Sequence, residues 1–160
     1  SGCAKEDDKG LVDKKMTTVN ITIPKQLVEQ GDFREKEEMK GVRYNDDGSV
    51  SFTVPRAKYE QSLKEMRHNI KEMLQEMSDG EDFPSIQEIK VNSAFDHYTI
   101  ENSLESFSLL GIGYAALLEQ AYAGKTEEAL SVQLDVQDVS TNEVFHTLTI
   151  PQDWNEAETK

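Results

Sequence analysis

The sequence predicts an α+β domain, in which an antiparallel or mixed sheet of about six strands carries two long helices on one face. Three observations lead to this prediction. Four short segments alternate apolar and polar residues and two more have apolar residues typical of strands. Two longer segments repeat apolar residues at helical spacing, and turn-forming residues separate the segments. With 160 residues, of which 36% are hydrophobic, the chain is long enough for one self-sufficient core, so we expect a single domain.

Period-two patterns identify the strands. The first covers residues 17–23, and Pro24 ends it before a short helix at 25–30. The Asp47-Gly48 turn opens a second strand over 50–54, in which the apolar residues again lie on one side. The remaining strands are predicted at 86–91, 95–100, 130–136 and 144–150.

Two segments have helical periodicity. The first follows Pro55, repeats apolar residues from Tyr59 to Met77 at spacings of three and four, and ends at Ser78-Asp79-Gly80. Its methionines are interpreted as core residues, with an adaptable peptide groove as the alternative. The second helix is expected to open with a capping box at Asn102–Glu105 and to continue to about Ala123.

The predicted elements follow the order β-β-α-β-β-α-β-β. Residues 50–139 have the strand, helix, strand, strand, helix, strand order of the split β-α-β unit, so we expect a ferredoxin-like middle with one extra strand at each end. The residues between the apolar ones in each strand are mostly serine, threonine, asparagine and glutamine. The face of the sheet away from the helices is therefore expected to be solvated.

Net charge excludes two classes of partner. The chain carries a formal charge of −14, and residues 101–160 hold eleven acids against Lys125 and Lys160. Such a surface repels nucleic-acid phosphates and anionic lipid headgroups, so direct binding to nucleic acid is not expected. The longest apolar run, Leu109–Leu118, is far shorter than the roughly 18 residues that a membrane-spanning helix needs.

Cys3 is the single cysteine, and it cannot form an intramolecular disulfide. Ser1-Gly2-Cys3 resembles the end of a bacterial lipobox, in which the cysteine is acylated and becomes the mature N-terminus; Ser1 and Gly2 are then signal-peptide residues or a cloning remnant. We therefore expect residues 1–16 to be a flexible lipoprotein tether, residues 17–151 the folded domain and residues 152–160 an acidic tail. An incidental cysteine in an unstructured terminus is the alternative.

Several segments together resemble a group of small, uncharacterised lipoproteins of Gram-positive bacteria. They are Asp47-Gly48-Ser49-Val50, the long Lys/Glu/Met helix, Phe83-Pro84-Ser85-Ile86, the segment from Leu104 to Gly111, and the final acidic strands. The resemblance covers about residues 16–150. It implies a domain outside the cytoplasm that is lipid-anchored to the outer face of the cell membrane, and it carries over no catalytic residue.

One segment matches a cofactor-binding pattern. Gly111-Ile112-Gly113-Tyr114-Ala115-Ala116 fits G-x-G-x-x-A, and Asp135 follows about 20 residues later, where a ribose-binding acid is expected. The pattern requires a strand that ends at the first glycine, which is possible at Phe107–Leu110. The preferred interpretation is that the glycines let an apolar helix approach the sheet closely, and no cofactor is predicted.

Histidine spacing gives no sign of a metal site. His68, His97 and His146 lie far apart in the sequence, and none has a second ligand three or four residues away, so no metal is predicted. Asp96-His97 is considered as half of a catalytic pair, but adjacent strand residues point to opposite faces. His97 is interpreted as a surface residue, and no catalytic residue is assigned.

These observations favour a non-enzymatic, lipid-anchored cell-surface protein that binds a protein, a peptide or an envelope component. The alternative is an exported envelope enzyme whose site is assembled from residues distant in sequence. The candidate partner surface is the polar sheet face, represented by Thr53, Gln133, Asp135 and Gln137. The apolar helix Ser103–Ala123 offers more than one apolar face. We expect one face to pack on the sheet and another on the Tyr59–Met77 helix or on a second protomer.

Overall fold

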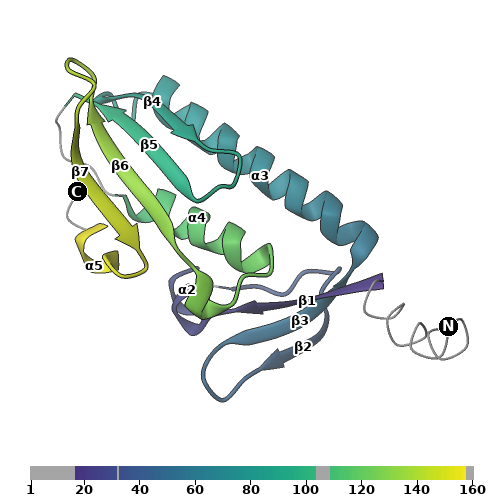
Figure 1. The fold of residues 1–160 in the computed structure, drawn as a ribbon. Helices are drawn as coiled ribbons and strands as arrows, with labels where there is room; N and C mark the ends of the chain where they lie inside the picture. The colour runs from purple at the N-terminus through teal and green to yellow at the C-terminus, as the bar shows by residue number, and fades with distance from the viewer. Residues whose placement is uncertain (1–16, 32, 104–108, 158–160) are drawn as a thin grey trace, which may run out of the picture.

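The computed structural model describes residues 17–31, 33–103 and 109–157 (Figure 1). It is an α+β fold with two sheets, one of three strands and one of four. The elements in chain order are β1 (Thr18–Ile23), α2 (Lys25–Gly31), β2 (Lys40–Tyr44), β3 (Val50–Pro55), α3 (Arg56–Asp79), β4 (Ile86–Val91), β5 (His97–Asn102), α4 (Leu110–Tyr122), η1 (Glu127–Ala129), β6 (Val132–Asp138), β7 (Val144–Ile150) and α5 (Trp154–Ala157).

The first sheet has the order β1-β3-β2 and is antiparallel throughout. Ile21 of β1 pairs with Phe52 of β3, and both side chains are buried in the core. Strand β2 was not predicted. Four of its five residues are exposed and only Val42 is partly buried, so this edge strand lacks the apolar alternation by which the other strands are recognised.

The second sheet has the order β4-β5-β6-β7. Its outer pairs are antiparallel, whereas β5 and β6 are parallel, with Tyr98 opposite Leu134 and Ile100 opposite Val136. Parallel neighbours require a crossover connection, and α4 lies in that connection. The mixed character of this sheet agrees with the sequence prediction.

The predicted single sheet and its ferredoxin-like middle are wrong, although the α+β class is confirmed. The elements from β3 to β6 follow the predicted order, but β3 pairs with β1 and β2 instead of joining β4–β6. Helix α3 has 24 residues and is therefore about 36 Å long, whereas a six-residue strand is about 20 Å long. The helix extends well beyond β3, and Figure 1 shows it leading from the first sheet to the second.

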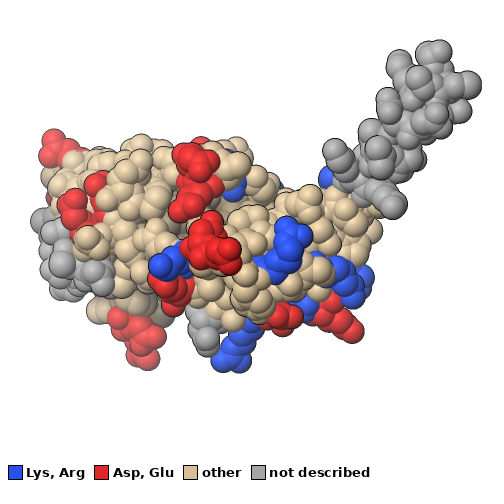
Figure 2. Space-filling view, turned by 90° about the horizontal axis from the view of Figure 1, so that it is seen from below, with Lys and Arg blue, Asp and Glu red and all other residues tan. Residues whose placement is uncertain are grey.

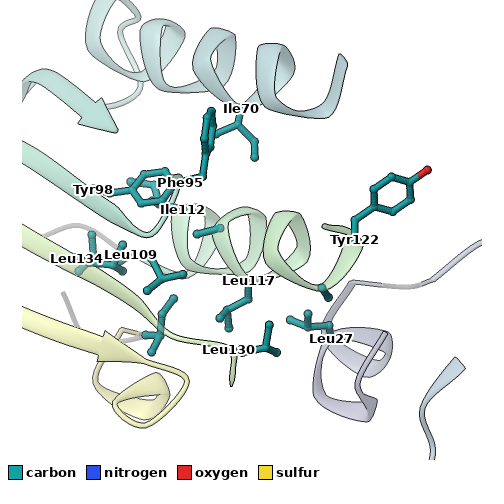
Figure 3. Close-up of a cluster of buried hydrophobic side chains, with 14 of the residues drawn as sticks. Leu27, Ile70, Phe95, Tyr98, Leu109, Ile112, Leu117, Tyr122, Leu130 and Leu134 are labelled. Carbon is teal, nitrogen blue, oxygen red and sulfur yellow. The ribbon is translucent and has the colours of Figure 1, made fainter. Parts of the chain in front are cut away.

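Helix α4 lies at the centre of the core and contacts α2, α3, α5, β1 and β6. Figure 3 shows side chains of this helix among those of α2, α3 and the second sheet. Ile112 and Leu117 are both about 1% exposed, and Tyr122 stacks on Tyr59 of α3 with ring centroids 5.5 Å apart. The expectation that this helix packs on more than one element is confirmed, because its apolar faces meet both sheets and α3.

The start of this helix differs from the prediction. Asn102 is the last residue of β5, and the described helix begins at Leu110. Glu105, the carboxylate of the predicted capping box, lies outside the described residues. The two glycines also have different environments: a Cβ atom added at Gly111 would meet nothing within 4 Å among the described residues, whereas one at Gly113 would lie 3.0 Å from Ile150 Cδ1. The close approach of α4 to Ile150 and Trp154 therefore explains the glycine at position 113, but it does not explain the glycine at position 111.

The segment that follows β7, predicted as the start of an acidic tail, contains helix α5. Trp154 and Ala157 are buried, and the ring of Trp154 would lie 3.1 Å from a Cβ atom added at Gly113. Asp153 accepts a hydrogen bond from the Thr149 amide, and the Ala157 carbonyl accepts one from the Leu109 amide. Residues 153–157 are thus part of the packed domain.

Candidate functional site

The four residues of the predicted partner surface lie on different sheets. Thr53 is in β3 of the first sheet, where its hydroxyl donates to the Lys40 carbonyl. Gln133, Asp135 and Gln137 are in β6 of the second sheet. The structure therefore brings three of the four residues together on one strand and places Thr53 elsewhere.

Asp135 is the centre of a polar network on the outer face of the second sheet. It is buried, and its carboxylate accepts hydrogen bonds from the Gln133 amide, the Thr147 hydroxyl and His97 Nε2, the last at 2.8 Å. Burial acts to raise the pKa of Asp135, but these hydrogen bonds and the His97 ring outweigh it, and the pKa lies below its ordinary value. The network links strands β5, β6 and β7.

An Asp–His pair is the arrangement that orients a general base in many hydrolases. Asp135 accepts a hydrogen bond from Nε2 of His97, so Nδ1 of the same ring is available to another partner. In the described part of the chain, however, no hydroxyl or thiol is hydrogen-bonded to His97, and neither residue lines the groove described below. The pair is therefore interpreted as a link between strands. The sequence predicts that His97 is a surface residue, and it does not predict the parallel pairing of β5 with β6 that brings His97 to Asp135.

A groove of about 670 Å³ lies beside α3, and ligand sites generally occupy about 300–1,000 Å³. Its floor comes from four different elements and consists of the buried side chains Ile23 of β1, Leu27 of α2, Phe52 of β3 and Ile70 of α3. These residues come together because β1 packs against both α3 and α4, β3 packs against α3, and α2 packs against α4. The groove is partly open to solvent.

The walls of the groove are apolar and adaptable. Met66 and Met73 of α3 line the groove together with Met39 of the 33–39 segment, and all three are partly buried. Phe33 packs against Phe52 with ring centroids 6.2 Å apart. Methionine side chains are flexible and polarizable, and they are frequent at surfaces that accept varied apolar partners. The sequence predicts that the methionines of this helix are core residues, with an adaptable groove as the alternative; Met66 and Met73 pack against the core and also line the groove.

Polar groups lie at intervals along the groove. Tyr114 and Tyr122 of α4 line it, and burial raises the pKa of both hydroxyls, so they are neutral donors at physiological pH. Tyr122 is hydrogen-bonded to Ser62 of α3. Glu65 and Asn69, both exposed, form part of the rim on α3. An apolar floor with a few hydrogen-bonding groups is the usual composition of a binding site.

Comparison with protein-family models, with curated proteins and with solved structures finds no match to this chain.

The dinucleotide-binding interpretation of Gly111–Ala116 is contradicted by the position of α4. Gly111 and Gly113 are the second and fourth residues of this helix, and Leu109 before it is not in a strand. The cofactor pattern requires a strand that ends at the first glycine, so that backbone N–H groups face the pyrophosphate.

Within the described residues, no three His, Cys, Asp or Glu side chains form a group that could hold a metal ion, and no helix is long and apolar enough to cross a membrane.

Proposed function

We propose that this protein is a non-enzymatic binding protein, lipid-anchored through Cys3 to the outer face of the cell membrane, and that the groove beside α3 binds an apolar peptide segment of a partner protein. The support for the anchor is the lipobox-like Ser1-Gly2-Cys3 and the polar lead that follows. Cys3 lies outside the described residues. Two acyl chains anchor a protein stably in a bilayer, because each buried methylene contributes roughly 0.8 kcal/mol to membrane binding.

The observation that carries the binding proposal is the groove itself. It combines a buried apolar floor with three methionines and spaced polar groups on its rim. Grooves of this kind accept amphipathic helices, whose apolar residues at i, i+3 or i+4, and i+7 enter the groove while the polar face stays in water. The partial opening of the groove to solvent favours such a segment over a fully enclosed small molecule.

A library of displayed random peptides tests the binding proposal. We expect the selected peptides to share apolar residues at helical spacing, and we expect Met66→Lys and Leu118→Lys to weaken their binding, measured by fluorescence polarization, by about tenfold or more. Gln61→Lys is the matched control, because it adds the same charge to an exposed position of α3 away from the groove. Peptides without a shared pattern, or equal binding by all variants, would contradict the proposal.

The anchor is tested separately in the full-length precursor. Cys3→Ala should abolish palmitate labelling and move the product from the membrane fraction to the medium, because the acyl chains on this cysteine are the proposed attachment to the bilayer. Retention of the variant in the membrane fraction, together with an unlabelled wild type, would exclude the lipid anchor and leave the groove proposal unaffected.

A further inference from the structure

A second cavity, of about 470 Å³, lies on the opposite flank of α3 from the groove. Its lining includes four basic side chains, one acidic side chain and one aromatic ring: Lys64, Arg67, His68, Lys71, Glu60 and Phe95. None of these residues lines the groove described above. Helix α3 therefore separates an apolar site from a basic one.

The concentration of positive charge is unusual in a chain with a net charge of −14. On the face shown in Figure 2, Lys and Arg atoms are interspersed with Asp and Glu atoms and form no continuous basic stretch. On α3, by contrast, Lys64, Arg67 or His68, and Lys71 follow each other at spacings of three and four, which places them on one face of the helix. Lys64 and Lys71 are two turns apart, about 10 Å along the axis.

Arg67 is held in position by a buried carboxylate. Its Nε donates to Glu119 Oε2 at 2.8 Å, and the Glu119 side chain is only 2% exposed, whereas that of Arg67 is 40% exposed. Only the Nε–H is used in this bond, so the four Nη–H donors of the guanidinium are left for other acceptors. Fixed guanidinium groups of this kind suit carboxylate and phosphate oxygens, because two parallel hydrogen bonds can form.

The floor of the cavity is the ring of Phe95, which is flanked by two cations. The Arg67 guanidinium carbon lies 5.5 Å from the ring centroid and Lys71 Nζ lies 5.7 Å from it. Phe95 has a backbone φ of 56°, an uncommon value for a bulky residue, and Asn92 fixes the turn by accepting hydrogen bonds from the amides of Asp96 and His97. The turn thus places an aromatic ring directly beneath the basic row.

The remaining basic groups are weakly compensated. Within the described residues, Lys64 and Lys71 have no carboxylate within ion-pair distance, and His68 lies 3.4 Å from the exposed Glu72. Acidic residues also lie at this site, because Glu60 lines the cavity, Glu119 binds Arg67 and Glu72 lies beside His68. Screening at physiological salt limits the effect of acids beyond about 8 Å.

We propose that this cavity binds an oligophosphate, meaning a ligand with two or more linked phosphate groups, through Lys64, Arg67 and Lys71. The guanidinium of Arg67 contacts one phosphate in a bidentate manner, and the two lysines contact phosphate oxygens on either side of it. The separation of the lysines and the size of the cavity exceed what a single phosphate fills, which is why linked phosphates fit the site better. The proposal does not depend on the peptide groove, since the two sites share no lining residue.

Isothermal titration calorimetry with the complete chain and inorganic tripolyphosphate tests this inference. We expect saturable binding at low ionic strength that weakens as salt is added. Binding of inorganic phosphate should be weaker by about tenfold or more, because fewer of the basic groups are used at once. Equal affinity for the two probes would contradict the assignment to linked phosphates.

The matched variants locate the site. Lys64→Gln with Lys71→Gln should weaken tripolyphosphate binding by about tenfold or more, whereas Lys40→Gln with Lys58→Gln, which removes two exposed lysines outside the cavity, should change it by less than about threefold. Thermal melts confirm that both double variants are folded. Equal losses in the two double variants would show non-specific charge attraction, and an absence of saturable binding to the wild type would likewise overturn the proposal.

Discussion

The hydroxyl of Tyr114 occupies the space that a Cβ atom on Gly31 would need. Gly31 is the last residue of α2 and Tyr114 lies in α4, so the contact joins two elements that border the groove. Glycine at this position is explained by the approach of the tyrosine side chain. A larger residue has to displace the ring, and the shape of the groove changes with it.

Gly31→Ala should therefore destabilise the protein by about 1–3 kcal/mol, the usual cost of forcing extra volume into a packed contact. In a Tyr114→Ala background the same substitution should cost much less, because the displaced ring is absent. Chemical denaturation of the two single variants and the double variant measures the coupling. Identical costs in both backgrounds would show that Tyr114 does not constrain residue 31.

The two glycines of α4 provide a matched pair. Gly113→Leu should destabilise by about 1–3 kcal/mol, because its side chain would enter the space between Ile150 and Trp154. Gly111→Leu should be neutral or stabilising by up to about 1 kcal/mol, since the position is exposed and leucine favours a helix more than glycine does. Thermal melts of the two variants measure the difference, and a greater loss at residue 111 would contradict the described packing of α4.

Gln133 and Gln137 lie on the same strand but have different partners. Gln133 donates to both oxygens of Asp135, whereas Gln137 donates to Asn142. At neutral pH, Gln133→Glu should destabilise by about 1–2 kcal/mol, because a second carboxylate would face Asp135. The free energy of unfolding of Gln137→Glu should stay within about 0.5 kcal/mol of the wild-type value.

The loss caused by Gln133→Glu should depend on pH. Repulsion between the introduced carboxylate and Asp135 exists only when both carboxyls are ionised, so the difference between variant and wild type should shrink as the pH falls below about 4 and one of them is protonated. Urea denaturation of the variant and the wild type at several pH values measures this difference in stability. A penalty that stays constant down to acidic pH would point to a steric effect in place of a charge effect.

Glu119 predicts a second dependence on pH, in which the loss of stability again grows as the pH rises. Burial raises its pKa above the ordinary 4.5, although Arg67 acts to lower it. A carboxyl with a higher pKa in the folded state stabilises the fold at low pH and loses that contribution as the pH rises through the folded pKa. Arg67→Met should therefore reduce stability at neutral pH by about 3 kcal/mol, and less at about pH 5, because the buried charge loses its partner.

The double variant Arg67→Met, Glu119→Gln is the control for this prediction. It removes the charge together with its partner, so the pH dependence caused by residue 119 should disappear, and part of the lost stability should return. Denaturation at about pH 5 and about pH 7 distinguishes the cases. If the single variant lost the same stability at both values, Glu119 would not be the titrating group.

The local pattern of apolar and polar residues was sufficient to predict most individual strands and helices. Strands β1, β3, β4 and β7 and helix α3 were predicted within about two residues, because burial of one face imposes a period that is visible in a short segment. Strand β2 was missed because its residues are mostly exposed, which removes that signal. The start of α4 was placed too early because a capping pattern was read across the end of β5.

The partition of the strands into two sheets was decided by tertiary structure. Strand pairing joins residues far apart in the chain, such as Ile21 with Phe52 and Thr99 with Asp135, and alternation within a strand does not identify its neighbour. The same limit applies to the polar network: the sequence placed Asp135 on an outward face, but only the parallel pairing of β5 and β6 brings His97 to within 2.8 Å of it.

The sequence by itself therefore determined the fold class, the buried faces of the strands and helices that have a clear apolar period, and the excess of negative charge. Tertiary structure alone decided where the cavities lie. Met66 and Lys64 are two residues apart on one helix, yet Met66 lines an apolar groove and Lys64 a basic cavity. The reason is geometric: residues two apart on a helix point in different directions, and what packs against each direction is set by segments distant in the sequence.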